Sequence, residues 1–510
     1  MARGKKRARA DGGDASGAPI PAPALTVVEE GSVRCVASSL AASAPGSAPG
    51  FFNPKMRVNR DMSVAAVAAA AEFHPPDLFP MRCLDAFASS GVLALRWAAE
   101  CGAPLRIVVN DASDVCASMA DENARAFASA AAGDAAEDPR PENVSLDIPA
   151  QNTPDDEDVP QPPPIFPTRD LPGTRSTLAV HRRRADALLH DAGERFHFVH
   201  LDPFGSVAPH LDAALARAPH GSILSLTATD TAALYGVYPG VARRRYRAET
   251  QPRPPWFREL GVRILVAAIA AAAARHERGV ARVLCAAYHE HFMQVVVRVE
   301  RGGTAADASV APNAVGPLWR CDACELDAAG GAAPCEHAVA LGPGWTRPLG
   351  DVAFLRMMAK MSRERVGRRF GGRDGDGDGD EGKKMADVKR VEIADGGKPA
   401  SASASSAATP RTKKPSTTTR LLDRLVEEAD GPPLFRLASR YAPSGGGLPP
   451  MDALTERLRG EGFRASRTHY HPAGIRTDAP ASALRDAIAT LAREIEAAKG
   501  DGTKDESRGE

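Results

Sequence analysis

The fold of this chain is decided by the stretch Phe196-His197-Phe198-Val199-His200-Leu201-Asp202-Pro203-Phe204-Gly205. Its first half is a short apolar and aromatic run, which is typical of a buried parallel strand. Pro203 ends such a strand because it has no N–H to donate, and Gly205 allows the backbone to turn tightly. Asp202 is therefore predicted at the carboxyl end of a strand, where open α/β sheets bind their ligands.

Three groups at this strand end suit one kind of ligand. The Asp202 carboxylate and the Pro203 carbonyl both accept hydrogen bonds, and the Phe204 ring offers a flat face for stacking. Together they match an exocyclic amino group on a flat heterocycle. Asp-Pro-Phe-Gly alone is equally compatible with a strand-to-turn corner in which Asp202 is a cap, so the rest of the chain has to decide.

Composition restricts the class of protein. The chain has 510 residues, 43% of them hydrophobic, which is enough for two or three domains with a substantial core. The 64 Lys and Arg residues balance 64 Asp and Glu residues, so only local charge clusters can indicate a nucleic-acid partner. No charge-free run of 18 apolar residues occurs, and we expect no membrane span. Five of the eight cysteines are scattered, which indicates a reducing compartment without a disulfide framework.

The amino-terminal segment, residues 1–24, is basic and then rich in Gly, Ala and Pro. The cluster Lys5-Lys6-Arg7 with Arg9 has three interpretations: a nuclear signal, the start of an organelle presequence, or a disordered solvated tail. We expect a nuclear protein that also reaches the mitochondrion or another organelle if the segment is a presequence.

Residues 81–91 predict a strand followed by a loop of small residues, and an apolar helix follows. The loop matches G-x-G-x-x-G poorly, but its small side chains still allow close approach of a ligand to the backbone. A second strand, residues 105–110, is followed by Asp111, 26 residues after Asp85. This is the offset at which an acid binds a ribose hydroxyl, with a helix N-cap as the alternative role of Asp111.

Further strands are predicted at residues 177–180, 221–230, 283–288 and 292–299, giving a sheet of about seven strands. Asp186-Ala187 follows the first of these, at a place suited to an adenine amino group. Residues 231–238 are predicted as a loop, and residues 434–441 as a helix. Residues 130–175 are rich in Asp, Glu and Pro without periodicity and are predicted as a disordered insertion. The low-complexity residues 370–419 are predicted as a disordered linker or insertion. These two segments interrupt a domain at 25–315 and a second domain at 316–490, and a tail follows at 491–510.

Two clusters have the composition of an RNA contact. Arg243-Arg244-Arg245 with Arg247 suits phosphates, although a solvated helix face is an equal alternative. Residues 462–470 with 474–478 are basic, aromatic and rich in hydroxyl groups, which suits an RNA backbone.

A third cluster is rich in metal ligands. Cys321-x-x-Cys324 is followed by Cys335 and His337. Two thiolates on one turn and a further Cys and His supply the four donors of a structural zinc knuckle. The alternative is a loop with three unbound thiols.

Taken in order, these segments resemble the tRNA guanine N2-dimethyltransferases that act on the guanosine at position 26. The resemblance covers most of residues 26–490 outside the insertions, and Asp-Pro-Phe-Gly-Ser and Thr-Ala-Thr-Asp-Thr are its most specific parts. It rests on Phe52-Asn53-Pro54 to Asn59-Arg60-Asp61, Leu84-Asp85-Ala86 to Gly91, Asn110-Asp111, Leu201–Ser206, Thr227–Thr231, Pro317-Leu318-Trp319, and Arg467-Thr468-His469 with Thr477-Asp478.

The resemblance implies an α/β fold, with a Rossmann-like class I S-adenosylmethionine-dependent methyltransferase domain and a family-specific C-terminal α+β domain. It implies S-adenosylmethionine as cofactor and tRNA as partner. We expect the protein to be a monomer. The matching site residues are Arg60 and Arg96 near the methionine end of the cofactor, Asp85, Asp111 at the ribose, Asp186 and Ala187 at the adenine, and Asp202 as the catalytic acid. The family often has two C-x-x-C pairs, and Cys335-x-His337 departs from that pattern.

The implied reaction is methylation of the guanine N2 amine to N2,N2-dimethylguanosine. We expect Asp202 and the Pro203 carbonyl to hold the N–H groups and accept a proton, while Phe204 stacks on the extruded base. Two alternatives remain: a methyltransferase acting on another exocyclic amine in RNA, and a non-catalytic RNA-binding protein that has this fold.

Overall fold

The computed structural model describes residues 25–38, 50, 52–132, 139–144, 166–191, 193–370, 415–443 and 447–505. Its largest element is an eight-stranded sheet with the order β5-β6-β4-β3-β7-β8-β10-β9. Strands β6, β4, β3, β7 and β8 are parallel, and β5, β10 and β9 are antiparallel to their neighbours. The bounds are β3 Met81–Asp85, β4 Leu105–Asn110, β5 Arg169–Leu171, β6 Ser176–His181, β7 Phe198–Leu201, β8 Ile223–Ala228, β9 Arg278–His289 and β10 Phe292–Arg301.

The strand order changes direction at the centre of this sheet. From β3 the chain moves outward through β4 to β6, and then returns to the other side of β3 as β7 and continues to β8. Ligands of open α/β sheets bind at such a switch point, outside the carboxyl ends of the strands. The sheet therefore has the Rossmann-like arrangement that the sequence predicts, with its ligand edge between β4, β3 and β7.

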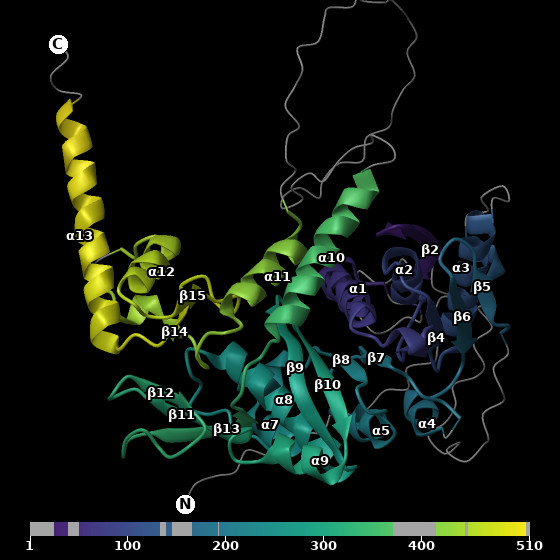
Figure 1. Ribbon diagram of the computed structural model, residues 1–510, viewed down its shortest axis with the longest axis horizontal. Helices are drawn as coiled ribbons and strands as arrows, with labels where there is room; N and C mark the ends of the chain where they lie inside the picture. The colour runs from purple at the N-terminus through teal and green to yellow at the C-terminus, as the bar shows by residue number, and fades with distance from the viewer. Residues whose placement is uncertain are drawn as a thin grey trace, which may run out of the picture.

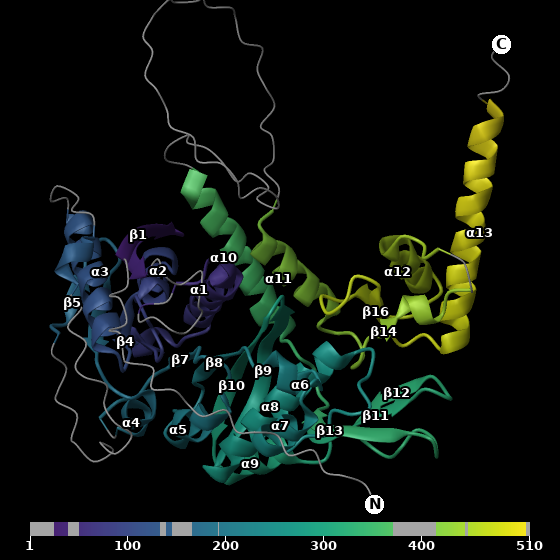
Figure 2. The ribbon, with the colours of Figure 1, turned by 180° about the vertical axis from the view of Figure 1, so that it is seen from behind.

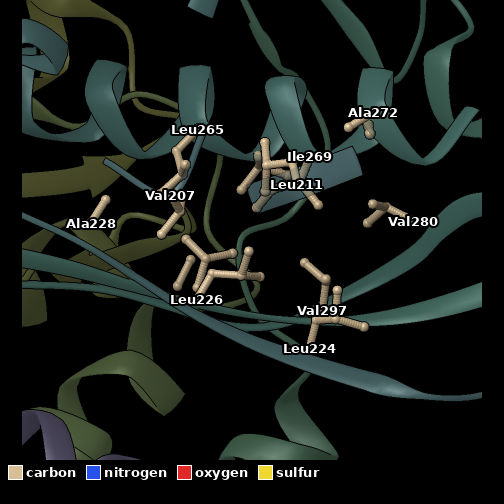
Figure 3. Close-up of a cluster of buried hydrophobic side chains, with 14 of the residues drawn as sticks. Val207, Leu211, Leu224, Leu226, Ala228, Leu265, Ile269, Ala272, Val280 and Val297 are labelled. Carbon is tan, nitrogen blue, oxygen red and sulfur yellow. The ribbon is translucent and has the colours of Figure 1, made fainter. Parts of the chain in front are cut away.

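One apolar core fills the space between the sheet and two helices, α5 (Leu211–Ala216) and α8 (Phe257–Arg275). Leu224 and Leu226 of β8 lie opposite Leu265 and Ile269 of α8 (Figure 3). Because alternate residues of a strand face opposite sides, Ile223 belongs instead to the core on the other face of the sheet.

That second core lies against α1 (Arg57–Glu72), α2 (Val92–Glu100), α10 (Val352–Phe370) and α11 (Thr417–Glu428). Helices α3 (Asp114–Ala132) and α4 (Ala185–His190) follow β4 and β6. The hairpin of β1 (Leu25–Glu30) and β2 (Val33–Ser38) is joined to α3 by Asn123, whose side chain donates to Val36 O at 3.0 Å and accepts from Val36 N. Three short helices complete this part, α6 (Thr231–Leu234), α7 (Pro239–Tyr246) and α9 (Gly303–Val310).

The C-terminal part of the described chain has two small sheets. The order β12-β11-β13 is formed by β11 Val315–Cys321, β12 Leu326–Ala329 and β13 Val339–Trp345, and β13 packs on α8. The order β14-β16-β15 is formed by β14 Arg436–Leu437, β15 Ala465–Arg467 and β16 Gly474–Thr477, with α12 Met451–Gly460 and α13 Ala481–Asp505. Figures 1 and 2 both show α12 and α13 at the opposite end of the molecule from α3.

Several sequence-based predictions are wrong in detail. The sheet has eight strands, because β5 pairs with β6 inside the predicted insertion 130–175, and α3 also continues to Ala132. Residues 434–441 are not a helix: they form β14 and a 3-10 turn, since tertiary pairing with β16 overrides local propensity. The predicted loop 231–238 contains α6.

Other predictions fall outside what the structure covers. Residues 1–24, and most of the predicted insertion 370–419, lie outside the described residues. Among the helices that are described, none has both the length and the apolar character needed to span a bilayer.

Candidate active site

Three carboxylates follow the three central strands of the sheet. Asp85 ends β3, Asp111 follows β4, and Asp202 follows β7. The parallel register pairs Asp85 with Val109 on one side and with His200 on the other, so all three acids meet at one edge. Burial raises the pKa of Asp85 to about 8, and repulsion from Asp202 and Asp111 adds to this shift. The sequence predicted these acids, and the structure brings them together.

Asp202 is held by an amide from the neighbouring helix. Asn59 of α1 donates from Nδ2 to Asp202 Oδ2 at 2.8 Å. Desolvation raises the pKa of Asp202 to about 7, although Arg60 and the Asn59 hydrogen bond oppose this shift. A carboxylate with a pKa near neutrality is suited to accept a proton during a reaction.

The turn after Asp202 presents an aromatic ring to solvent. Pro203 is buried, whereas Phe204 is 74% exposed. The next residue, Gly205, has φ +82°, and its N–H donates to Thr229 Oγ1 at 3.0 Å while its carbonyl accepts from Thr229 N at 2.9 Å. These bonds to the segment after β8 fix the turn that carries the exposed Phe204, two residues after Asp202.

The loop between β3 and α2 brings its backbone close to Asp111. Ser89 N donates to Asp111 Oδ2 at 2.9 Å, and Ser89 and Gly91 both have positive φ. A Cβ at Gly91 would lie 3.2 Å from the Cβ of Ala120, so glycine permits close packing on α3. Asp111 Oδ1 also accepts from Ser113 N at 2.9 Å, and burial raises its pKa. Asp111 is therefore not the N-cap of α3, since the Ser113 hydroxyl accepts from Cys116 N at 3.4 Å in that position, and Asp111 lies at the predicted ligand edge.

Arg96 is 1% exposed and lies in a buried ion-pair network that the sequence did not predict. It donates from Nη1 to Glu30 Oε1 at 2.6 Å and from Nε to Glu100 Oε1 at 2.9 Å, and it also pairs with Asp61. Arg60 shares Glu30, with Nε to Oε1 at 2.7 Å. The spacing of Arg96 and Glu100 along α2 was the available sequence signal for one of these pairs.

Asp186 and Ala187 begin α4, at the carboxyl end of β6. Asp186 accepts from Arg184 at 3.1–3.2 Å, and this pair lowers the pKa of Asp186. Ala187 is exposed. Since β6 lies two strands from β3 in the sheet, both residues lie at the same edge as the three acids but further from Asp202.

The predicted zinc ligands lie elsewhere, at the small sheet of β11, β12 and β13 (Figure 1). Cys321 ends β11, Cys324 lies in the turn to β12, and Cys335 lies between β12 and β13. The sulfur atoms of Cys321, Cys324 and Cys335 all lie within 4.8 Å of one another. His337 Nδ1 is 3.9 Å from Cys324 Sγ. The structure therefore gathers three of the four predicted donors, the cysteine sulfurs, around one point, and the His337 ring lies beside one of them, Cys324.

The predicted RNA cluster at 462–478 has another role. Thr468 and His469 both bond to Glu428, and the buried Arg476 pairs with Glu259 and Glu428. Their side chains point into a junction between α8, α11 and β16. The prediction of an RNA-facing surface here is wrong for these residues, because the composition of a cluster does not show which charges are paired inside the protein.

The arginines of α7 remain at the surface. Arg243 pairs with Glu249 and Arg245 with Asp230, and all of Arg243, Arg244 and Arg245 are exposed. Asp230 also accepts from Tyr246 Oη at 2.9 Å. Because Asp230 N donates to Gly205 O at 3.2 Å, helix α7 is linked to the turn that holds Gly205.

The sequence profile of the family described as N2,N2-dimethylguanosine tRNA methyltransferase matches residues 31–136, 169–373 and 400–489. The chain belongs to this family. The family members that resemble it include a tRNA (guanine(26)-N(2))-dimethyltransferase from Methanosphaerula palustris, 29% identical over 87% of this chain and 92% of the relative. A relative from Aeropyrum pernix with the same name is 28% identical over 93% of this chain and 99% of its own length.

The mammalian relatives are named for guanine 27 of tRNA, next to the guanine 26 in the names of the two microbial relatives. The tRNA (guanine(27)-N(2))-dimethyltransferase of Bos taurus is 28% identical over 86% of this chain, and the chain spans 59% of its length. The fold matches the solved structure of Trm1 from Pyrococcus horikoshii in complex with S-adenosyl-L-methionine, with a TM-score of 0.61 and 24% identity over 91% of this chain and 100% of the other. The shared fold confirms the predicted α/β class.

Proposed function

We propose that this protein is an S-adenosylmethionine-dependent tRNA methyltransferase that converts guanosine 26 into N2,N2-dimethylguanosine. The observation that carries the proposal is the turn Asp202-Pro203-Phe204, where a proton-accepting carboxylate and an exposed aromatic ring meet at the ligand edge of the sheet. Membership of the family supports the same reaction.

The residues at the edge fit the cofactor. S-adenosylmethionine supplies a methyl group on a positively charged sulfur, and a cationic ligand at this edge would favour the ionised forms of Asp85, Asp111 and Asp202, which burial disfavours. The buried Asn110 Oδ1 has no partner among the described residues and remains able to accept a hydrogen bond at this edge. Asp111 would accept hydrogen bonds from the ribose hydroxyls of S-adenosylmethionine, and Asp186 with Ala187 would contact its adenine.

Arg60 and Arg96 have different parts in this proposal. Arg60 lies within the electrostatic reach of Asp202 and stacks over Phe52 at 4.7 Å. Glu30 and the Asn53 carbonyl occupy its Nε and Nη2, so Nη1 is the nitrogen that would hold the cofactor carboxylate. All three nitrogens of Arg96 are occupied by Glu30, Asp61 and Glu100. We propose that Arg96 orders the acids around Arg60 instead of touching the cofactor.

Asp202 would accept the proton that the reaction releases. The N2 lone pair of guanine is delocalised into the ring, which makes the amine a weak nucleophile. An N–H bonded to the Asp202 carboxylate and another bonded to the Pro203 carbonyl favour a pyramidal nitrogen whose lone pair is directed at the methyl group. As the N–C bond forms and the C–S bond breaks, the electron pair stays on sulfur and the N2 proton passes to Asp202.

The target base has to leave its stack to reach Asp202, and Phe204 would stack on it. Val237 and Tyr238 lie in the chain between α6 and the arginine-bearing helix α7, and they are 54% and 59% exposed. Aromatic and basic side chains in alternation are typical of surfaces that hold single-stranded nucleic acid. We therefore place the tRNA on this side of the molecule.

The experiment that tests the function is incubation of the purified protein with S-adenosylmethionine and unmodified tRNA transcripts, followed by nucleoside mass spectrometry. N2,N2-dimethylguanosine that disappears when nucleotide 26 is changed supports the proposal. Loss only when nucleotide 27 is changed would assign the protein to the site named in its mammalian relatives. Cofactor binding without any methylated guanosine would indicate that the substrate is another exocyclic amine in RNA. No cofactor binding would indicate a non-catalytic RNA-binding protein.

Zinc is the second proposed ligand. Three cysteine sulfurs and one imidazole form a donor set that suits tetrahedral Zn²⁺. Bound there, zinc would join the end of β11 and the β11–β12 turn to the loop between β12 and β13. Its role would be structural.

We propose a monomer located in the nucleus, with an organelle as a second destination if residues 1–24 act as a presequence. The basic cluster at Lys5–Arg9 supports this location. Imaging of full-length and 1–24-deleted fluorescent fusions would test it, and unchanged distribution after deletion would contradict it.

A further inference from the structure

Two buried polar side chains, Asn59 and Thr227, form a chain of hydrogen bonds that ends at Asp202. Asn59 of α1 donates from Nδ2 to Asp202 Oδ2 at 2.8 Å. Thr227 of β8 donates from Oγ1 to Asn59 Oδ1 at 3.1 Å. Asn59 and Thr227 are both fully buried, and three elements that are distant in sequence meet in this chain of hydrogen bonds.

The direction of these bonds is fixed by chemistry. An ionised carboxylate only accepts hydrogen bonds, so the amide nitrogen of Asn59 has to face Asp202. The amide oxygen then faces Thr227, whose hydroxyl has to donate. Thr227 therefore locks the Asn59 amide in the one orientation that presents an N–H to the carboxylate.

We propose that Asn59 and Thr227 are positioning residues of the methyl transfer, which hold Asp202 ionised and aim its second oxygen at the substrate amine. The inference rests on the proposed function, since it assigns how the proposed base is set. Because Asn59 occupies Oδ2, Oδ1 is the oxygen left to take the N2 proton. In both methyl transfers to N2, the same oxygen, Asp202 Oδ1, would then accept the proton.

Charged groups around Asp202 act in opposite directions. Arg60 of α1 favours the ionised carboxylate, and Asp85 at the end of β3 is repelled by it. His200 on β7 is buried and its pKa is lowered to about 3, so it remains neutral. Asn59 thus donates a hydrogen bond from an uncharged amide, and this bond helps Arg60 to keep Asp202 ionised against the repulsion from Asp85.

The test compares two substitutions at Thr227 that differ only in the hydroxyl. Thr227→Ser keeps the donor, and Thr227→Val keeps the shape without it. We expect Thr227→Ser to remain within about twofold of the wild type, and Thr227→Val to lower kcat by about 10-fold, since small misplacements of a reacting group are costly. Asn59→Asp removes the N–H at the same size and should lower kcat by about 100-fold, within the range for loss of general-base catalysis.

Three readouts separate positioning from damage to the fold. The KM for tRNA and the calorimetric affinity for S-adenosylmethionine should stay within about twofold in both Thr227 variants. The rising part of the curve of kcat against pH should shift to higher pH in Thr227→Val and Asn59→Asp. In both variants the Asn59 N–H to Asp202 is lost or misdirected, which favours the neutral form of Asp202. The infrared band of the protonated Asp202 carboxyl, assigned with Asp202→Asn, should persist to higher pH in the same variants, with no turnover needed.

The control is Thr250→Val, at a buried threonine whose hydroxyl has no partner among the described residues. It should have wild-type kinetics. If Thr227→Val and Thr227→Ser share the same kcat and the same pH profile, the inference is wrong. If the wild type itself methylates no tRNA, the proposed function fails, and the infrared titration still tests whether Asn59 sets the ionisation of Asp202.

Discussion

Arg476 of β16 pairs with Glu259 of α8, with Nη1 3.0 Å from Oε1, and both side chains are buried. Arg476 also reaches Glu428 of α11 at 3.2 Å, and Arg263 pairs with the same Glu259 at 2.8 Å. Two buried carboxylates and two buried guanidinium groups therefore join the C-terminal sheet to the helices of the main domain.

We predict that Arg476→Met destabilises the protein by about 3–5 kcal/mol, because removal of one partner leaves Glu259 and Glu428 buried without their common cation. Chemical denaturation followed by fluorescence would measure this. Arg464→Ala is the matched control, since Arg464 forms an exposed pair with Asp478 and should change little. Equal stability of Arg476→Met and the wild type would contradict the prediction.

The same junction predicts a dependence of stability on pH. Burial acts to raise the pKa of Glu259, but Arg476 and Arg263 outweigh it and hold the pKa at about 2. The pKa of Glu259 is thus lower in the folded state than in the unfolded state, so its contribution is complete above about pH 4.5 and is lost as the pH falls towards 2. The stability difference between wild type and Glu259→Gln should shrink over that range, and a constant difference would contradict this.

Asp202→Asn should lower kcat by about 10²- to 10⁴-fold, because the amide cannot take the N2 proton. Its affinity for S-adenosylmethionine, measured by calorimetry, should be little changed. Retention of more than a tenth of wild-type kcat would exclude Asp202 as the base.

The wild-type kcat should rise with pH through about 7 and then level off. Asp202 accepts a proton only when it is ionised, and desolvation raises its pKa to about 7. Single-turnover rates between pH 5.5 and 9 would measure the curve. A rate that is flat across this range would contradict the assignment.

Phe204→Ala should lower kcat/KM for tRNA by about 5- to 150-fold, which corresponds to the 1–3 kcal/mol that stacking of one base contributes. Phe204→Tyr keeps the flat ring and should remain close to wild type. Because Phe204 is 74% exposed, the fold should not depend on it, and thermal unfolding would verify this. Equal kcat/KM for the Ala and Tyr variants would remove Phe204 from the substrate site.

The purified protein should contain about one zinc ion, measured by elemental mass spectrometry, and Cys324→Ser should lose it. Since the knuckle joins the loops of the small β11-β12-β13 sheet, loss of zinc should lower the unfolding temperature more than it lowers the affinity for S-adenosylmethionine. A zinc-free wild type purified without chelators would contradict the proposal.

The sequence by itself determined the strand-to-turn signal at Asp202, the acids at Asp85 and Asp111, and the Cys and His donors, because each depends on residues close together in the chain. Backbone constraints of proline and glycine and the spacing of ligands are local properties, and they can be recognised before any fold is known.

Only the tertiary structure decided which polar groups are paired. Arg96 and Arg476 carry the same charge as Arg244, but two are buried among carboxylates and the third is exposed. Asn59 meets Asp202 across 143 positions of the chain. Such contacts depend on how helices pack on the sheet, and the desolvation that shifts the pKa of Asp202 and Asp85 arises only once that packing removes water from the acidic edge.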